Sequence, residues 1–142
     1  MNGCLYTDDL FKKIFLNTKN IALVGASPKG ASRASWRVMK YLQFNGFNVY
    51  PVNPNAAGQK ILGEQVFPSL LDVPERVDMV DIFRRSKYVK PIVEHALQIN
   101  ASFIWMQLGA IDEESAQVAR SFGKIVIMDR CPAIEIPRLD LK

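Results

Sequence analysis

The fold is decided by the stretch IALVGASPKGASR, residues 21–33. Four apolar residues, Ile21 to Val24, lead directly into a turn that contains Gly25, and a helical pattern begins at about Ser32. A buried strand, a tight loop and a helix start, in this order, are the parts of a nucleotide-binding βα unit. The free N–H groups and the dipole at the helix start favour an anion. We therefore expect a ligand-binding loop, although an ordinary βα turn without a ligand has the same pattern.

The composition is that of one ordinary globular domain spanning residues 1–142, with 49% hydrophobic and 23% charged residues. The sequence contains no long uncharged apolar run, so we expect no membrane span, and no signal peptide is visible. The cysteines, Cys4 and Cys131, lie far apart and the single histidine is His95, so we expect neither a disulfide framework nor a metal site. The net charge of +4 comes without a basic run, which argues against nucleic acid. We expect a cytoplasmic protein.

Hydrophobic periodicity predicts five strands that alternate with helices. The strands are expected at residues 21–24, 47–50, 77–83, 102–106 and 124–128, and the helices at 7–17, 32–44, 86–100 and 112–122. Pro51 is expected to end the second strand, residues 55–63 to form a polar loop, and the tail from 133 to be irregular. Such alternation gives a parallel sheet covered by helices on both faces. We predict an α/β, Rossmann-like domain with strand order 3-2-1-4-5, and the flavodoxin-like order 2-1-3-4-5 is the alternative.

Ligands of such sheets bind outside the carboxyl ends of the strands. The loops of that edge carry several polar residues, which are Ser27, Lys29, Arg33, Asn53, Lys60, Arg84, Arg85, Gln107 and Arg130. Only Asp129 and Glu64 oppose the cations nearby. A solvated loop surface would also be rich in Lys and Arg. Fixed amides together with several cations nevertheless favour a multiply anionic ligand.

The loop differs from two common phosphate-binding sequences. Gly25 and Gly30 have the Walker A spacing, but Ala31 stands where that motif requires Lys, which disfavours ATP or GTP hydrolysis. Ser27 replaces the middle glycine of G-x-G-x-x-G, and Asn53 follows the second strand where NAD binding requires a carboxylate. The sequence therefore argues against NAD and leaves another phosphate-rich nucleotide open.

Five short blocks occur in order along the chain: VGAS at 24–27, PVNP at 51–54, FR at 83–84, WMQLG at 105–109 and DRC at 129–131. Together they resemble the small bacterial and archaeal CoA-binding proteins. These proteins look like a free-standing counterpart of the CoA-binding domain of succinyl-CoA synthetase alpha subunits. The resemblance covers about residues 10 to 138 and implies that coenzyme A is the ligand.

The resemblance also implies a binding site. Ala26, Ser27 and the next helix start would hold the diphosphate, while residues 51–54 would flank the adenine. Phe83, Arg84 and residues 107–110 would line the pantetheine arm, and Arg33 and Lys60 are candidates for the 3′-phosphate. The full candidate set is Gly25, Ala26, Ser27, Lys29, Arg33, Pro51, Val52, Asn53, Pro54, Lys60, Phe83, Arg84, Gln107, Gly109, Ala110 and Arg130.

The sequence offers no complete catalytic set. In the synthetase that the chain resembles, a phosphorylated histidine lies outside the CoA domain, and His95 is expected in mid-helix, away from the crevice. Cys131, next to Arg130, is the remaining reactive candidate for a mixed disulfide with CoA, and a small buried cysteine is the alternative. We therefore expect binding of CoA or an acyl-CoA without catalysis.

Two other functions stay open at this point. One is an NADP-binding regulatory or redox domain, which Arg33 and Lys60 would allow. The other is a small acyl-CoA enzyme that uses Cys131 or a recruited partner. We expect a small-molecule ligand, no nucleic acid and no membrane, while a protein partner or a homo-oligomer is compatible with the sequence.

Overall fold

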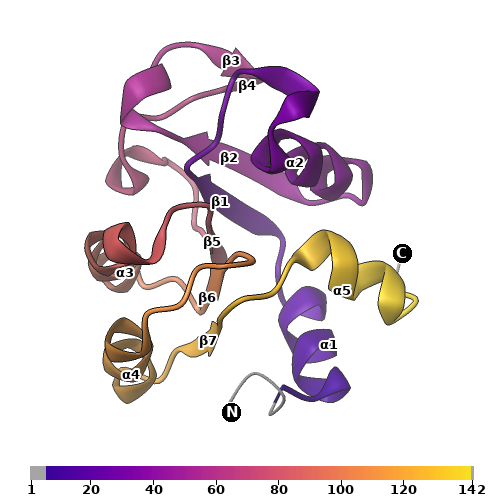
Figure 1. Ribbon diagram of the computed structural model, residues 1–142, viewed down its shortest axis with the longest axis vertical. Coiled ribbons are helices and arrows are strands. Elements are labelled where there is room, and N and C mark those ends of the chain that lie inside the picture. Colours follow the sequence, from indigo (N-terminus) through magenta and orange to yellow (C-terminus); the bar gives the residue numbers. More distant parts are fainter. Residues whose placement is uncertain (1–5, 142) are drawn as a thin grey trace.

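A five-stranded parallel sheet forms the centre of the molecule in the computed structural model, which describes residues 6–141 (Figure 1). Its strands are β1 (Asn20–Val24), β2 (Asn48–Val52), β5 (Met79–Ile82), β6 (Phe103–Met106) and β7 (Ile125–Ile127). Each pair of neighbours is parallel. The predicted α/β class and the five predicted strands are confirmed.

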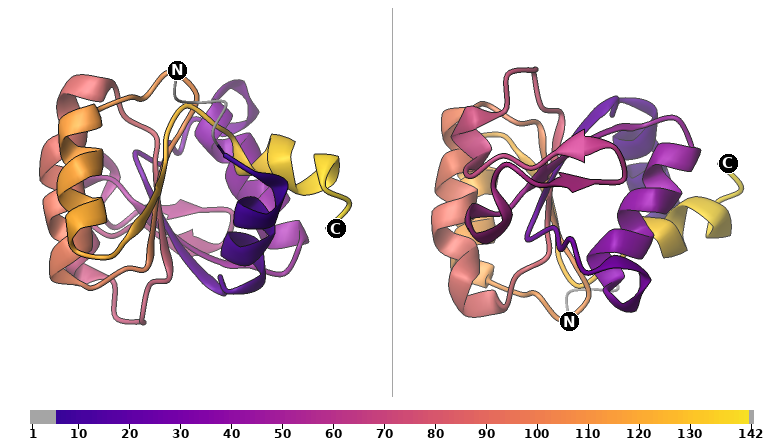
Figure 2. Two further views of the ribbon diagram at one scale, coloured as in Figure 1. Left: turned by 90° about the horizontal axis from the view of Figure 1, so that it is seen from below. Right: turned by 90° about the horizontal axis from the view of Figure 1, so that it is seen from above.

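Helices cover both faces of this sheet. They are α1 (Asp8–Leu16), α2 (Ala34–Phe44), α3 (Val89–Gln98), α4 (Glu113–Ser121) and α5 (Pro132–Arg138). The two views of Figure 2 show the sheet between a layer of α3 and α4 and a layer of α1, α2 and α5. Two clusters of buried residues fill the layers, one around Trp105 and Met39 and the other around Ile104 and Val93. No helix within residues 6–141 is long and apolar enough to cross a membrane.

The order of the strands is β2-β1-β5-β6-β7, which corresponds to 2-1-3-4-5 along the chain. The predicted order 3-2-1-4-5 is therefore wrong, and the flavodoxin-like alternative is confirmed. The connection after β2 explains the difference, because it packs on the outer edge of β2 where a third strand would pair. Phe67 N–H donates to Pro51 O over 2.9 Å, and Asn53 N–H donates to Phe67 O over 2.9 Å. The next strand consequently pairs with β1, and the topological switch point lies between β1 and β5.

This connection is more ordered than the predicted polar loop. It contains the hairpin of β3 (Lys60–Ile61) and β4 (Glu64–Gln65), between the 3₁₀ turns η3 (Pro54–Ala56) and η4 (Leu70–Asp72). Ile61 and Val66 are buried and anchor the hairpin in the core.

Two predictions that rested on prolines are wrong, namely the end of the second strand at Pro51 and the irregular tail from residue 133. Strand β2 continues through Pro51, because the Pro51 carbonyl faces outward to Phe67 and the missing N–H lies on the same outer side. The tail forms α5 instead of an irregular segment. Pro132 occupies the first helical position, where its missing N–H costs nothing, and buried Ile136 holds the helix against the sheet.

The outer edge of β7 is also occupied. Met128 N–H donates to the Tyr6 hydroxyl over 2.8 Å, and the Arg120 guanidinium donates to Val126 O over 3.1 Å. Side chains from α4 and from the segment before α1 thus use backbone groups that a further strand would need.

Candidate functional site

A cavity of about 290 Å³ opens at the carboxyl edge of the sheet. Its wall consists of Ala34, Phe83, Arg84, Arg85, Gln107, Leu108 and Gly109, and we call it the β5–β6 cavity. Four of these residues, Phe83, Arg84, Gln107 and Gly109, are predicted site residues. The structure therefore brings together the predicted residues of the blocks at 83–84 and 105–109 at the switch point.

Gly25 makes the sharp turn that ends β1 beside this cavity. Its φ is +94°, and a Cβ there would lie 2.3 Å from Phe83 O. The Gly25 N–H donates to Val52 O over 2.8 Å. Because any side chain at position 25 would collide with the backbone after β5, glycine keeps the loop close to the ends of β2 and β5.

The amides of the predicted diphosphate loop bond within the protein. Ala26 N–H donates to Val52 O, Ser27 N–H donates to the Ser35 hydroxyl over 3.2 Å, and Lys29 N–H donates to the Ser27 hydroxyl over 3.2 Å. These bonds fix the shape of the loop. They also leave the start of α2 as the better position for an anion.

The first turn of α2 carries amide groups that precede its regular hydrogen bonds. Arg33 is the N-cap residue but makes no side-chain capping bond, and the first backbone bond runs from Arg37 N–H to Arg33 O. Ala34, whose amide belongs to this turn, lines the β5–β6 cavity together with Arg84 and Arg85. The first turn contains no acidic residue. The uncapped helix start and two arginine residues therefore border one cavity.

Asn53 has a structural role beside the loop. Its Nδ2 donates to Ala26 O over 2.8 Å, and its Oδ1 accepts from Asn55 N–H over 2.9 Å. The side chain thus ties the end of β2 to the glycine loop.

A second cavity of about 190 Å³ lies on the other side of Arg84. We call it the β1–β2 cavity, and it is lined by Val24, Val52, Pro54, Pro68, Ser69, Leu70, Arg84, Ile92 and His95. Val52, Pro54 and Arg84 are predicted site residues, whereas Pro51 is buried within β2. Arg84 borders both cavities, and its guanidinium lies 4.4 Å from the centre of the Tyr88 ring.

Sequence reasoning missed six residues of this second cavity, namely Val24, Pro68, Ser69, Leu70, Ile92 and His95. The expectation that His95 lies away from the crevice is wrong, because His95 stands one helical turn after Ile92 on the face of α3 that borders the cavity. The spacing of Ile92 and His95 was the available signal. Pro68 and Ser69 follow Phe67, whose bridge to Val52 was not visible in the sequence.

The helix that was expected from residue 86 begins at Val89 instead, so Ser86 does not cap α3. It belongs to the 3₁₀ turn η5 (Ser86–Tyr88), and its hydroxyl accepts from Ile111 N–H over 3.0 Å. Gly109 N–H donates to the Asp129 carboxylate over 2.7 Å. The loops after β5, β6 and β7 are therefore joined by hydrogen bonds at the rim of the β5–β6 cavity. Asp112 does occupy the N-cap of α4, and its carboxylate accepts from the Ser115 hydroxyl.

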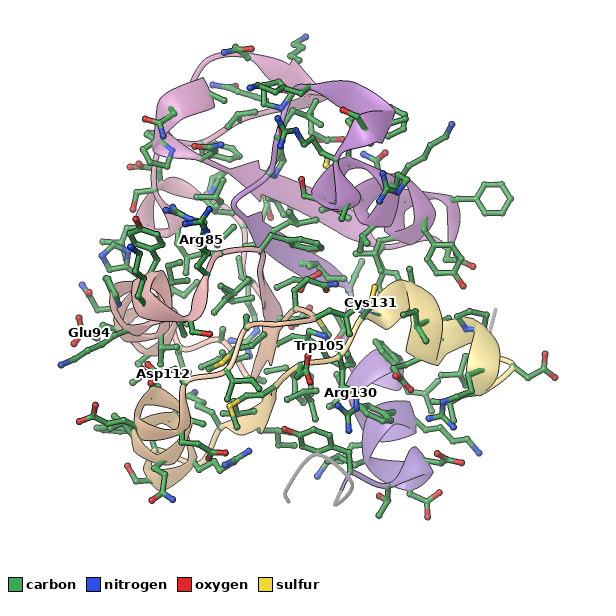
Figure 3. All side chains as sticks on the ribbon, viewed as in Figure 1. Arg85, Glu94, Trp105, Asp112, Arg130 and Cys131 are labelled. Atoms are coloured by element: carbon green, nitrogen blue, oxygen red, sulfur yellow. The ribbon has the colours of Figure 1, made fainter. Side chains whose placement is uncertain are left out.

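Ten predicted site residues line neither of these two cavities. Gly25, Ala26, Ser27, Pro51 and Asn53 are described above, and the other five are Lys29, Arg33, Lys60, Ala110 and Arg130. Of these five, the first three are exposed, and Ala110 is buried in the core. The Arg130 guanidinium lies 5.2 Å from the centre of the Tyr6 ring. Figure 3 shows Arg85 near the start of α3 and Arg130 next to α1.

Cys131 is a free, buried residue at the N-cap position of α5, with 6% of its surface exposed. It packs in the same cluster as Trp105, as the alternative of a small buried cysteine predicted. Cys4 lies outside the described residues. Among residues 6–141 no group of three His, Cys, Asp or Glu side chains is placed to hold a metal ion.

Asp81 was not singled out by the sequence, although it is a charged residue type within a buried strand. It is fully buried on β5, and neither carboxyl oxygen has a hydrogen-bond partner within the described structure. Burial raises the pKa of the Asp81 carboxyl well above its usual value. Gln107 is 6% exposed, and its Oε1 is likewise buried without a partner.

Comparison with known proteins shows which family this chain belongs to. Residues 19–137 match the family described as "CoA binding domain". The protein "Uncharacterized protein YneT" of Bacillus subtilis (strain 168) is 36% identical over 120 residues, which are 84% of this chain and 87% of the relative. A solved structure, "hypothetical protein from Pyrococcus horikoshii OT3", is 38% identical with a TM-score of 0.89, covering 95% of this chain and 93% of that chain.

A third relative is a much longer protein. "Acetate--CoA ligase [ADP-forming] II" of Archaeoglobus fulgidus is 38% identical over 82 residues, which are 56% of this chain but 12% of the ligase. The matched family covers both the glycine loop and the residues of the two cavities. The chain therefore belongs to the family of CoA-binding domains, as the five sequence blocks predicted.

Proposed function

We propose that this protein binds coenzyme A, or an acyl-CoA, across the carboxyl edge of its sheet and has no catalytic activity of its own. The observation that carries the proposal is the uncapped start of α2, which faces the β5–β6 cavity together with Arg84 and Arg85. A helix dipole and two guanidinium groups suit a diphosphate. Membership of the CoA-binding family supports this ligand.

The two cavities suggest how the ligand lies. The adenine would occupy the β1–β2 cavity, between the apolar walls of Pro54 and Pro68 and beside Ser69 and His95. The diphosphate would lie at the start of α2. The pantetheine arm would follow the β5–β6 cavity, along Phe83, Gln107 and Gly109. One ligand spans both cavities in this arrangement.

The 3′-phosphate would remain near the protein surface. Exposed Arg33 and Lys60 are the predicted contacts, and the residue directly after β2 is Asn53, not a carboxylate that would repel this group. Within residues 6–141 neither side chain forms an ion pair with a carboxylate.

The walls of the two cavities support binding without catalysis. His95 is the one histidine in either wall, and no carboxylate lines either cavity. Paired acid and base groups, which most hydrolytic or transfer reactions need, are therefore not assembled in these walls.

Isothermal titration of the protein with CoA, dephospho-CoA, NAD and NADP at one salt concentration tests the proposal. We expect CoA to bind most tightly and dephospho-CoA to bind more weakly. Arg84→Ala should weaken CoA binding, whereas the control Lys12→Ala, which changes an exposed residue of α1, should not. A failure of CoA to bind would overturn the proposal, and selective binding of NADP would favour the NADP-binding alternative.

A further inference from the structure

Two unsatisfied polar groups lie under the β5–β6 cavity. Both carboxyl oxygens of Asp81 and the Oε1 of Gln107 are buried without a hydrogen-bond partner in the described structure. The two residues are 0% and 6% exposed, respectively. A buried polar atom without a partner costs free energy, so two such groups close together need a common explanation.

The register of the sheet makes them neighbours. Asp81 on β5 is paired with Trp105 on β6, and Gln107 follows Trp105 by two residues. Because side chains alternate along a strand, Asp81 and Gln107 point to the same face. Gln107 N–H donates to Ile82 O over 3.1 Å, which keeps this register beyond the last paired residue. The two residues are therefore diagonal neighbours, a relation that long side chains can span.

Their hydrogen-bonding properties are complementary. Desolvation raises the pKa of the Asp81 carboxyl, and a neutral carboxyl carries one O–H donor. The Gln107 Oε1 is an acceptor. The Asp81 O–H can therefore satisfy the Gln107 Oε1, after a side-chain rotation or through one bridging water.

We propose that Asp81 is a positioning residue that, as a neutral acid, donates a hydrogen bond to Gln107 Oε1 and turns the Gln107 NH₂ group toward the cavity. There the NH₂ group donates to a carbonyl oxygen on the pantetheine arm of the ligand. The inference rests on the proposed function, because the arm must lie in this cavity. It makes Gln107 the residue that recognises the arm and Asp81 the residue that orients it.

Four variants test the pairing. Asp81→Asn keeps an N–H donor at the same place and size, whereas Asp81→Val removes the donor and suits a buried strand. Gln107→Met removes the amide. Met79→Leu is the matched control, because it repacks the same face of β5 two residues deeper without changing a polar group.

Affinity is measured by titration with CoA and with 3′-phospho-ADP, which lacks the arm. We expect Asp81→Val to raise the Kd for CoA about three- to tenfold and to leave 3′-phospho-ADP unchanged. Asp81→Asn and Met79→Leu should stay close to the wild type. The double variant Asp81→Val/Gln107→Met should bind CoA no more weakly than Gln107→Met alone, because both changes remove one interaction.

A second measurement needs no ligand. The side-chain NH₂ signals of Gln107, identified by their loss in Gln107→Met, should have distinct nitrogen and proton shifts in the wild type and in Asp81→Asn. In Asp81→Val they should move to the positions of unbonded amides. Unchanged signals, or unchanged CoA affinity in Asp81→Val, would overturn the inference. If the wild type bound no CoA, the proposed function would fail instead, and the NH₂ signals would still decide whether Asp81 and Gln107 pair.

Discussion

At the scale of single residues, Gly25 shows how one backbone conformation shapes the site. Its φ of +94° and the 2.3 Å approach of a Cβ to Phe83 O both exclude a side chain. Gly30 has a φ of +83° but open space around it. A side chain at position 30 would therefore suffer only from the positive φ, whereas a side chain at position 25 would also collide with Phe83 O.

We expect Gly25→Ala to lower the free energy of unfolding more than Gly30→Ala does. Gly30→Ala pays mainly for the strained φ, about 1 kcal/mol, whereas Gly25→Ala also displaces the loop. Denaturant unfolding followed by circular dichroism measures both. Equal losses in the two variants would show that the contact with Phe83 relaxes without cost.

Asp81 gives the stability a pH dependence. Its pKa is raised in the folded state, so folded Asp81 keeps its proton at pH values where the unfolded chain ionises. The Asp81 contribution to the free energy of unfolding therefore falls as the pH rises above the unfolded pKa, by at most about 1.4 kcal/mol per pH unit.

Asp81→Asn removes this titration. We expect the difference in free energy of unfolding between Asp81→Asn and the wild type to grow in favour of the variant from about pH 4 upward. Cys131 and Glu135, the titratable groups buried at α5, remain in both proteins and cancel in the difference. Urea unfolding between pH 4 and pH 8 gives the comparison, and parallel pH profiles would contradict it.

At the scale of elements, the start of α2 is less stable than it could be. Arg33 occupies the N-cap with extended φ and ψ of −105° and 135°, but its side chain makes no capping bond. An acidic or amide side chain at this position would cap the helix. The natural residue instead leaves the first-turn amides available beside the cavity.

We expect Arg33→Asp to raise the free energy of unfolding by about 0.5–2 kcal/mol and to weaken CoA binding. The new carboxylate would accept a hydrogen bond from an N–H group of the first turn and would repel the ligand phosphates. Arg33→Asn is the control, because it caps the helix without a negative charge and should bind more tightly than Arg33→Asp. Thermal unfolding and titration measure the two effects, and equal affinity of both variants would refute a charge effect.

The positions of the strands could be predicted from the sequence better than the order in which they pair. Each of the predicted strands at 21–24, 102–106 and 124–128 contains an uninterrupted apolar run, at 21–24, 103–106 and 125–128, so the strands could be located from local pattern. Strand order depends on the contact of Phe67 with the outer edge of β2, which no local pattern encodes. Helix α5 was not predicted because Pro132 and Pro137 argue against a helix, whereas the packing of Ile136 in the core stabilises it.

The same division holds for the site. Gly25, Phe83 and Gln107 lie in blocks that the family resemblance identified, and the structure brings them to one edge. His95 and Ser69 lie outside those blocks and reach the β1–β2 cavity through the packing of α3 and η4. The hydrogen bonds that use the amides of Ala26 and Ser27 depend on Val52 and Ser35, so their existence required the structure.

At the scale of the whole molecule, Arg84 joins two cavities that different parts of the chain build. A ligand that spans both should protect distant segments together. We expect CoA to slow hydrogen exchange in the first turn of α2, at residues 67–71 and at residues 107–111 with one common dissociation constant.

3′-phospho-ADP provides the control for this measurement. It should protect the first two segments but not residues 107–111, because it lacks the pantetheine arm. Helix α4, outside both cavity walls, should not change with either ligand. Protection confined to one cavity would contradict a ligand that spans both.

The hydrogen bonds along the two outer strands have a consequence for aggregation. Phe67 occupies backbone groups at the edge of β2, while Tyr6 and Arg120 occupy those of β7. An exposed strand edge is a template for intermolecular β-pairing, and these contacts remove part of that template at both ends of the sheet. Tyr6 lies before the first helix, but its hydroxyl accepts a hydrogen bond from Met128, directly after the last strand. Loss of the residues ahead of α1 would therefore free the Met128 amide and make the folded chain more prone to join edge to edge into insoluble assemblies.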